Sequence, residues 1–117
     1  MDEIKTITAE IRAFIDERDW AQFHNPKELA AAIAIEAAEV QEQFLWKGYD
    51  ASEAHVADPE KLEPIADEIA DVAVYLFELA DNLGLDLIEE MRRKMAKNAE
   101  KYPVEKAKGS NLKYTEL

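Results

Sequence analysis

Apolar residues recur at three- and four-residue steps through every long segment of this chain, and only three glycines interrupt it. Such spacing places apolar side chains on one face of a helix, whereas a half-buried strand would need strict alternation. The first example is a stripe that predicts a core-facing helix over about residues 2–18: Ile4, Ile7, Ile11 and Phe14. We therefore expect an all-α fold that resembles a four-helix bundle.

Capping signals set the limits of the second predicted helix. Asn25 can accept a hydrogen bond from the first turn, Pro26 suits that turn, and Glu28 can complete a capping box. The helix should run to about Trp46, since Gly48 is a natural stop. We expect residues 47–58 to form a connecting loop.

Pro59 opens a third predicted helix, residues 60–83, which is apolar around most of its circumference and is therefore expected to be buried. Asp86, with Glu89 three residues later, predicts the start of a fourth helix that ends near Tyr102. Beyond Pro103 the chain is lysine-rich and weakly periodic. The sequence thus predicts one helical domain, residues 1–103, followed by an extended arm, residues 104–117.

Charge and composition exclude several functions. The net charge of −12, from 26 acidic and 14 basic residues, repels nucleic acids and anionic membranes. With no cysteine, the chain has no thiol nucleophile, disulfide or zinc knuckle. No segment approaches the roughly 20 apolar residues that span a bilayer. We expect a cytoplasmic protein without nucleic-acid or membrane partners.

Two acidic pairs are the strongest candidates for chemistry. Glu36 and Glu39 lie one turn apart on the second predicted helix, and Glu68 and Asp71 repeat this spacing on the third. Acidic pairs are common on solvated faces, but these lie in apolar segments, where an unpaired charge is costly. If the two helices pack antiparallel, the four carboxylates converge and require a cation. Mg²⁺ suits an all-oxygen site of this kind.

Other metal and nucleotide motifs do not fit. A ferritin-like site needs histidine three residues after glutamate, and neither His24 nor His55 is so placed. No EF-hand loop, P-loop or GxGxxG occurs. Nucleotide binding would therefore depend on metal and side chains.

The acidic pairs resemble the hallmark of the MazG-like superfamily, the all-α nucleoside triphosphate pyrophosphohydrolases. That hallmark is EExxE, a spacer and ExxD, and the matching residues are Glu36-Ala37-Ala38-Glu39 and Glu68-Ile69-Ala70-Asp71. One departure is Ile35, which stands where the superfamily has the first glutamate. The metal ligand expected at this position of the motif is therefore absent.

Within the superfamily, nearly the whole chain resembles the dCTP pyrophosphatase branch. The resemblance rests on an ordered set of segments: Glu17-Arg18-Asp19-Trp20, Phe23-His24-Asn25-Pro26, Glu42-Gln43-Phe44-Leu45-Trp46-Lys47, Glu68-Ile69-Ala70-Asp71-Val72, Tyr75-Leu76, Lys94-Met95, Asn98, Lys101-Tyr102-Pro103 and Lys113-Tyr114-Thr115-Glu116-Leu117. It implies Mg²⁺-dependent hydrolysis between the α- and β-phosphates of a nucleoside triphosphate, with the four carboxylates as metal ligands and catalytic residues. It also implies a homodimer or homotetramer.

Seven further residues are candidates for substrate binding. Lys94, Asn98 and Tyr102 recur at four-residue steps on one helix, where they can reach phosphate or sugar, and the resemblance assigns them to substrate. Trp20 can stack a base. The others are His24 and Trp46, in the same pocket, and Tyr75, whose ring would disfavour a 2′-hydroxyl. As ordinary alternatives, the tryptophans are core or interface anchors and His24 braces a helix start.

Three functions remain open at this point. The first is a dCTP pyrophosphohydrolase. The second is a broader enzyme that removes modified or non-standard nucleotides from the pool. The third belongs to another class, a non-catalytic helical module whose acidic face binds a basic partner.

Overall fold

The computed structural model describes residues 2–117 as helices joined by short turns, and this part of the chain contains no strand. The all-α prediction is confirmed. Two compact units are distinguished, an N-terminal unit that extends to Gly84 and a C-terminal unit over Leu85–Leu117. None of the described helices is both long and apolar enough to cross a membrane.

The N-terminal unit begins with α1 (Glu3–Glu17), the short 3₁₀ turn η1 (Ala21–Phe23) and α2 (Pro26–Glu42). The Asn25 side chain accepts a hydrogen bond from the backbone N–H of Glu28 at 3.0 Å, so the predicted cap is confirmed. However, α2 ends four residues before Trp46, which has a positive φ of 64°. Since left-handed backbone ends a helix, the predicted extension to Trp46 was wrong.

The segment that we expected to be a loop contains another helix, α3 (Tyr49–Ala57), so that prediction was also wrong. Gly48 is the N-cap of α3, and Asp58 follows its last residue. The same Asp58 caps the next helix by accepting from the N–H of Glu60 at 3.0 Å. Short polar stretches rich in alanine lack an apolar stripe, yet they have high helix propensity. Periodicity alone therefore missed α3.

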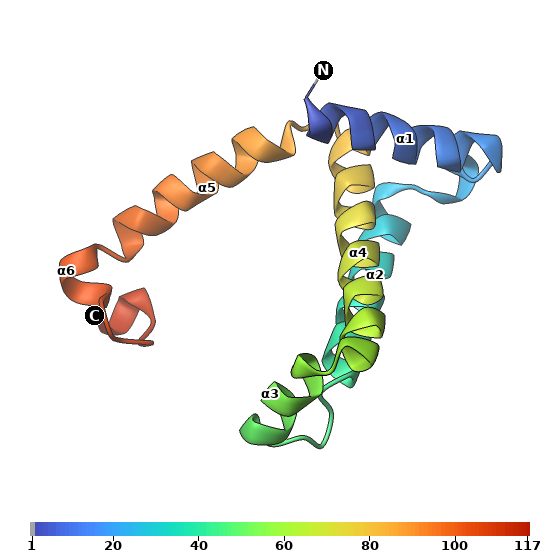
Figure 1. Ribbon diagram of the computed structural model, residues 1–117. Coiled ribbons are helices and arrows are strands. Elements are labelled where there is room, and N and C mark those ends of the chain that lie inside the picture. The colour runs from blue at the N-terminus through green and yellow to red at the C-terminus, as the bar shows by residue number, and fades with distance from the viewer. Residues whose placement is uncertain (1) are drawn as a thin grey trace. The chain divides into compact units, whose positions relative to one another are not determined.

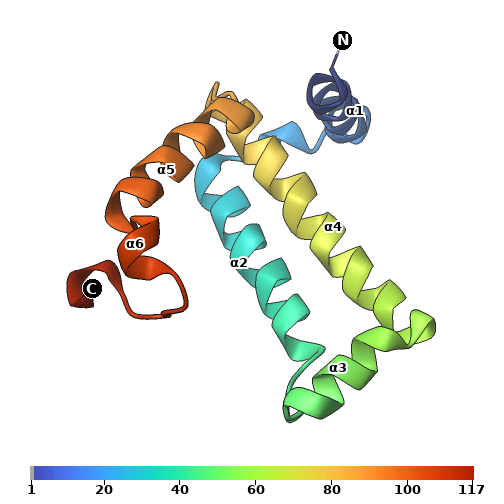
Figure 2. The same ribbon diagram turned by 60° about the vertical axis from the view of Figure 1, so that its left-hand side comes forward.

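The long helix α4 (Pro59–Asn82) is the centre of the N-terminal unit, because α1, α2 and α3 all contact it. Figures 1 and 2 show α2 and α4 side by side and antiparallel, with α3 joining them at one end. At the other end α1 crosses α4, where the Arg12 guanidinium contacts the Asp81 carboxylate through hydrogen bonds of 2.7 and 3.0 Å. The antiparallel α2–α4 pair was the geometry that the carboxylate prediction required.

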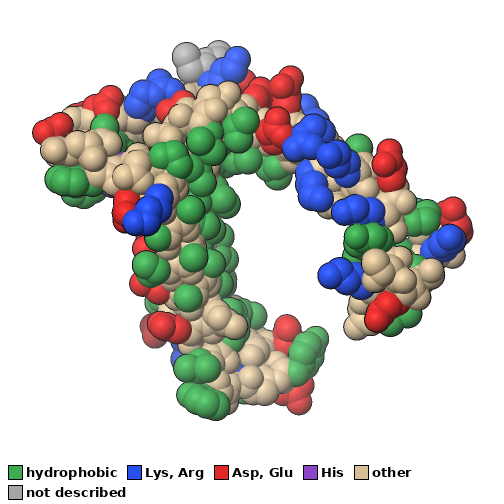
Figure 3. All heavy atoms as spheres, turned by 180° about the vertical axis from the view of Figure 1, so that it is seen from behind, with side chains coloured by type: hydrophobic (Ala, Val, Ile, Leu, Met, Phe, Trp, Pro, Cys, Tyr) green, Lys and Arg blue, Asp and Glu red, His purple; other side chains and the backbone are tan. Residues whose placement is uncertain are grey.

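The apolar faces of this unit are less buried than the sequence indicated. The core of the described chain consists of Ile11, Ile15, Leu29, Ile65 and Ala80. On α4, however, Ile69 is 55% exposed and Leu76 is 41% exposed, and on α1 Phe14 is 48% exposed. The expectation that the third predicted helix is buried was therefore wrong, because α1, α2 and α3 leave part of its circumference uncovered. Figure 3 shows the side opposite to the view of Figure 1, and hydrophobic side chains gather there along the α2–α4 pair.

The C-terminal unit consists of α5 (Leu87–Lys101), α6 (Val104–Ala107) and the 3₁₀ turn η2 (Tyr114–Glu116). The predicted cap is confirmed, since Asp86 accepts a hydrogen bond from the N–H of Glu89 at 3.2 Å. The arm expected after Pro103 is not fully extended, because α6 and η2 interrupt it and Tyr114 packs edge-on against Tyr102 at 6.0 Å.

Candidate active site

Three glutamates converge between α2 and α4. Glu36 and Glu39 come from one turn of α2, and Glu68 comes from the facing side of α4. One carboxylate oxygen from each lies within 4.8 Å of the other two. One oxygen of Glu36 and one of Glu68 are buried and have no hydrogen-bond partner. Carboxylates this close repel one another, and their buried oxygens lack hydrogen-bond donors. The cluster is therefore stable only when protons or a cation lie between the carboxylates.

The crowding raises pKa values within the cluster. The pKa of Glu68 is raised from 4.5 to about 7, first by the hydrogen-bonded carboxyl group of Glu39, then by that of Glu36 and by burial. Burial raises the pKa of Glu36, and the charges of Glu39 and Asp71 add to that effect. Without a cation, the cluster therefore retains a proton close to neutral pH.

This retained proton predicts how the metal-free protein responds to pH. Folding raises the pKa of Glu68 from 4.5 to about 7, so the protonated form of Glu68 favours the folded state. This contribution to the free energy of unfolding is complete below about pH 4.5 and is lost as the pH rises through about 7. We expect Glu68→Gln to melt higher than the parent at pH 8 in EDTA, with a smaller difference at pH 5. Thermal unfolding of both proteins across this range measures the effect. Parallel curves would contradict it.

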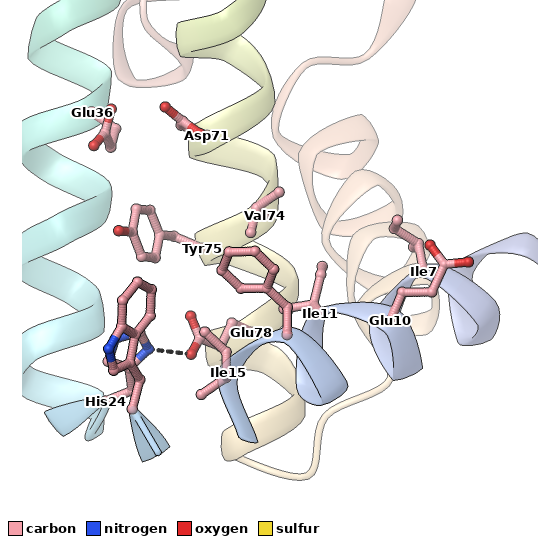
Figure 4. A pocket seen from close by; sticks show the side chains of 12 residues that line it. Ile7, Glu10, Ile11, Ile15, His24, Glu36, Asp71, Val74, Tyr75 and Glu78 are labelled. Carbon is pink, nitrogen blue, oxygen red and sulfur yellow. Dashed lines mark hydrogen bonds and ion pairs between the residues drawn. The ribbon is translucent and has the colours of Figure 1, made fainter. Parts of the chain in front are cut away.

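Asp71, the fourth predicted carboxylate, stands beside this cluster. It lies one turn after Glu68 on α4 and is near enough for its charge to raise the pKa of Glu36. Asp71 and Glu36 also line a pocket of about 410 Å³ in the N-terminal unit. Figure 4 shows their two carboxylates facing each other from α4 and α2 at one end of this pocket. The structure thus brings all four predicted carboxylates into one region.

The opposite end of the pocket is aromatic. Trp20 and His24 flank η1, with ring centroids 6.1 Å apart, and Phe14 packs edge-on against Trp20 at 5.9 Å. Tyr75 lies between the two ends (Figure 4), and burial raises its pKa. Three predicted substrate residues, Trp20, His24 and Tyr75, therefore line the same pocket as Glu36 and Asp71.

The other predicted substrate residues are not among those that line this pocket of the N-terminal unit. Trp46 belongs to the N-terminal unit, is 94% exposed and is absent from the pocket lining. Lys94, Asn98 and Tyr102 belong to the C-terminal unit, the first two on α5 and Tyr102 at its C-cap. Their proposed contact with substrate stays a prediction.

Glu78 is a pocket residue to which the sequence assigned no role. Glu78 lies on the face of α4 that also carries Asp71 and Tyr75, and its Oε1 is 2.5 Å from Nδ1 of His24. The two residues are 54 positions apart in the chain, so helical spacing indicated only that Glu78 extends the acidic face. The pairing depends on how η1 folds back against α4.

Comparisons with known proteins identify the family of this chain. The sequence matches the MazG-like family over residues 31–117. It is 36% identical over 117 residues to dCTP pyrophosphatase 1 of Mus musculus, covering 100% of this chain and 67% of the relative. The identity and coverage are the same for dCTP pyrophosphatase 1 of Homo sapiens. The crystal structure of a pyrophosphatase from Archaeoglobus fulgidus superposes with a TM-score of 0.83 and 36% identity, over 88% of this chain and 94% of that one.

The fold and the site together define a class, all-α proteins whose facing helices present a carboxylate cluster suited to a divalent cation. Within that class, the chain belongs to the MazG-like family. The predicted family is therefore confirmed.

Proposed function

We propose that this protein is a Mg²⁺-dependent nucleoside triphosphate pyrophosphohydrolase that converts dCTP, or a related pyrimidine deoxynucleotide, to the monophosphate and pyrophosphate. Membership of the MazG-like family and the similarity to dCTP pyrophosphatases support an enzyme of the nucleoside triphosphate diphosphatase class. A non-catalytic acidic module is thereby set aside. The observation that carries the proposal is the glutamate cluster beside an aromatic pocket.

The carboxylates fit a hard divalent cation. Their oxygens are close enough to share one ion, and the unpartnered oxygens of Glu36 and Glu68 are free to coordinate it. We assign Glu36, Glu39, Glu68 and Asp71 as the residues that hold Mg²⁺. When bound, the ion supplies charge neutralisation for the phosphates and lowers the pKa of water.

The residues of the site then have separate tasks. The carboxylates would hold the cation that neutralises the phosphates, and the unpartnered oxygens of Glu36 and Glu68 are available to it. The aromatic end excludes water from the base, and Trp20 offers a face for stacking. The water that attacks the α-phosphorus would enter at the carboxylate end. Such attack requires in-line positioning, which the packing of α2 against α4 favours.

We further propose that Tyr75 distinguishes deoxyribose from ribose, because its ring lies between the carboxylate and aromatic ends of the pocket. A ring packed against the sugar leaves no room for a 2′-hydroxyl. We expect Tyr75→Ala to reduce the preference for dCTP over CTP by about tenfold, and Tyr75→Phe, which keeps the ring, to retain it. The ratio of kcat/KM for the two substrates is the measurement. An alanine variant with full deoxy preference would contradict this role.

Residues of the C-terminal unit are proposed as additional phosphate and sugar contacts. Lys94 and Asn98 occupy successive turns of α5, and Tyr102 follows as its C-cap. The proposed bounds of the functional domain remain residues 1–103, as the sequence predicts. This proposal rests on the motif resemblance and on the chemistry of an amine, an amide and a phenol beside a triphosphate.

A panel of triphosphates at equal concentration tests the substrate. If the protein is a dCTP pyrophosphohydrolase, we expect pyrophosphate release to be fastest with dCTP and to require Mg²⁺. If it is instead the second candidate, a broad enzyme that clears modified or non-standard nucleotides, we expect several such compounds to be hydrolysed as fast as dCTP or faster. Release of single phosphates would exclude both. A cytoplasmic location, which we also propose, would place either activity with the free nucleotide pool.

We also propose that the protein forms a homodimer or homotetramer. Exposed apolar residues such as Leu62, Ile69 and Leu76 on α4 support an interface with a second copy. We expect light scattering to give at least twice the mass of one chain, and the double variant Leu62→Glu/Leu76→Glu to lower it. The neighbouring polar substitution Glu63→Gln should leave the mass unchanged. A monomeric parent protein would contradict the proposal.

A further inference from the structure

Glu78 has one carboxylate oxygen in use and one without a partner. Its Oε1 contacts Nδ1 of His24, and the side chain is only 11% exposed. Its Oε2 is buried and makes no hydrogen bond. The free-energy cost of a buried acceptor without a donor is larger than the net stabilisation from an ordinary hydrogen bond. Glu78 is therefore prepared for one further N–H or O–H donor.

The pocket itself supplies no such donor to this oxygen. Its lining contains no lysine, arginine, asparagine or glutamine. Four carboxylates line it instead, and the remaining residues are apolar or aromatic: Ile7, Glu10, Ile11, Phe14, Ile15, Trp20, His24, Glu36, Asp71, Val74, Tyr75 and Glu78. A ligand group that reaches Glu78 thus meets a carboxylate oxygen without a partner, while the donors at this end of the pocket belong to Trp20, His24 and Tyr75. An N–H group is favoured there, whereas a carbonyl oxygen would face a carboxylate.

The spacing along α4 fits a nucleoside. Asp71, Tyr75 and Glu78 occupy one face of the helix at steps of four and three residues. With a rise of 1.5 Å per residue, Asp71 and Glu78 are about 10 Å apart along the axis. Figure 4 shows the same order, with the carboxylates at one end, Tyr75 in the middle and the His24–Glu78 pair at the other end. Phosphate, sugar and base can occupy these three positions in turn.

We propose that Glu78 is a specificity-determining residue that accepts a hydrogen bond from the exocyclic amino group of the nucleobase. The inference rests on the proposed pyrophosphohydrolase function, because a phosphate at the carboxylate end is what directs the base towards Glu78. Glu78 lines the pocket, and because Oε1 is held by His24, Oε2 is the carboxylate oxygen that is left for a ligand. Bases with an amino group, such as cytosine, can donate a hydrogen bond to this oxygen, whereas their oxo counterparts cannot.

His24 has a supporting part in this arrangement. Its contact with Glu78 fixes the direction of the carboxylate, and the Asn82 side chain donates to the His24 backbone carbonyl at 3.4 Å. Both interactions attach η1 to α4. If Glu78 served only this attachment, its replacement would weaken all nucleotides alike.

The first test uses the unaltered protein with Mg²⁺. The substrates are dCTP and the triphosphate of deoxyribosyl pyrimidin-2-one, which differs only by lacking the amino group. We expect kcat/KM to fall by about 10- to 100-fold without this group, as is usual when a charged acceptor loses its donor, with most of the change in KM. Equal kcat/KM values would overturn the proposal. Because this test uses no variant, misfolding of a variant cannot affect its result.

The second test compares Glu78→Gln with Glu10→Gln. In Glu78→Gln the new amide oxygen can still accept from His24, but an amide N–H replaces the free carboxylate oxygen. We expect the preference for dCTP over dUTP to fall by about tenfold or more in this variant. Glu10→Gln removes one negative charge from the same pocket, at an exposed position on α1, and should leave the preference unchanged.

The outcomes separate the two proposals. If no triphosphate is cleaved to pyrophosphate, the proposed function fails and the base assignment fails with it. If dCTP is cleaved but the amino group has no effect, only the assignment of Glu78 fails. An equal loss of preference in Glu10→Gln, or an unchanged preference in a folded Glu78→Gln, would also overturn that assignment.

Discussion

Replacing Asp71 by Asn, or Glu39 by Gln, is expected to lower kcat/KM for dCTP by at least about 100-fold, because a metal ligand contributes several kcal/mol to stabilisation of a charged transition state. The two residues come from α4 and α2, so equal losses would show that both helices build one site. The measurement is Mg²⁺-dependent pyrophosphate release by each variant.

The folded state of these variants can be checked independently. Both substitutions preserve side-chain volume and remove a charge from a crowded acidic region, so the metal-free variants should melt at or above the temperature of the parent. Glu63→Gln, an exposed position on α4, is the matched control and should keep full activity. A folded Asp71→Asn variant with near-normal activity would exclude Asp71 from the metal site.

Removing the metal is expected to reduce dCTP hydrolysis to the background rate. Excess EDTA should abolish pyrophosphate release, and added Mg²⁺ should restore it. A non-hydrolysable dCTP analogue should raise the melting temperature only when Mg²⁺ is present, since binding to the folded state stabilises it in proportion to ligand occupancy. In Glu39→Gln this Mg²⁺-dependent shift should be smaller.

Other outcomes would point away from a metal site. If activity survives EDTA, the carboxylates act without a cation. If the analogue stabilises the protein equally with and without Mg²⁺, the nucleotide binds through side chains alone. Either result would contradict the role proposed for the glutamate cluster.

Local signals predicted the helix starts well because the cap is a short-range interaction. Asn25 and Asp86 accept the hydrogen bonds that their sequence contexts indicated. The helix α3 was missed because its alanine-rich segment has propensity but no apolar stripe. The end of α2 was misplaced because nothing before Trp46 signals a left-handed residue.

The carboxylates were predictable for a similar reason. Residues three apart on a helix share a face in any fold, so Glu36 with Glu39 and Glu68 with Asp71 required only that α2 and α4 pack together. The His24–Glu78 contact was different, since it depends on the path of the chain through η1. The exposure of Ile69 on α4 was not predictable either. An apolar face indicates that a surface is to be covered, but it does not indicate whether another helix of the same chain covers it.

Product analysis in ¹⁸O-labelled water tests the central claim most directly. The protein is incubated with dCTP and Mg²⁺, and the products are identified by mass spectrometry. We expect one labelled oxygen in dCMP and none in pyrophosphate, because water attacks the α-phosphorus. Label in pyrophosphate, release of single phosphates, or no Mg²⁺-dependent turnover would contradict it.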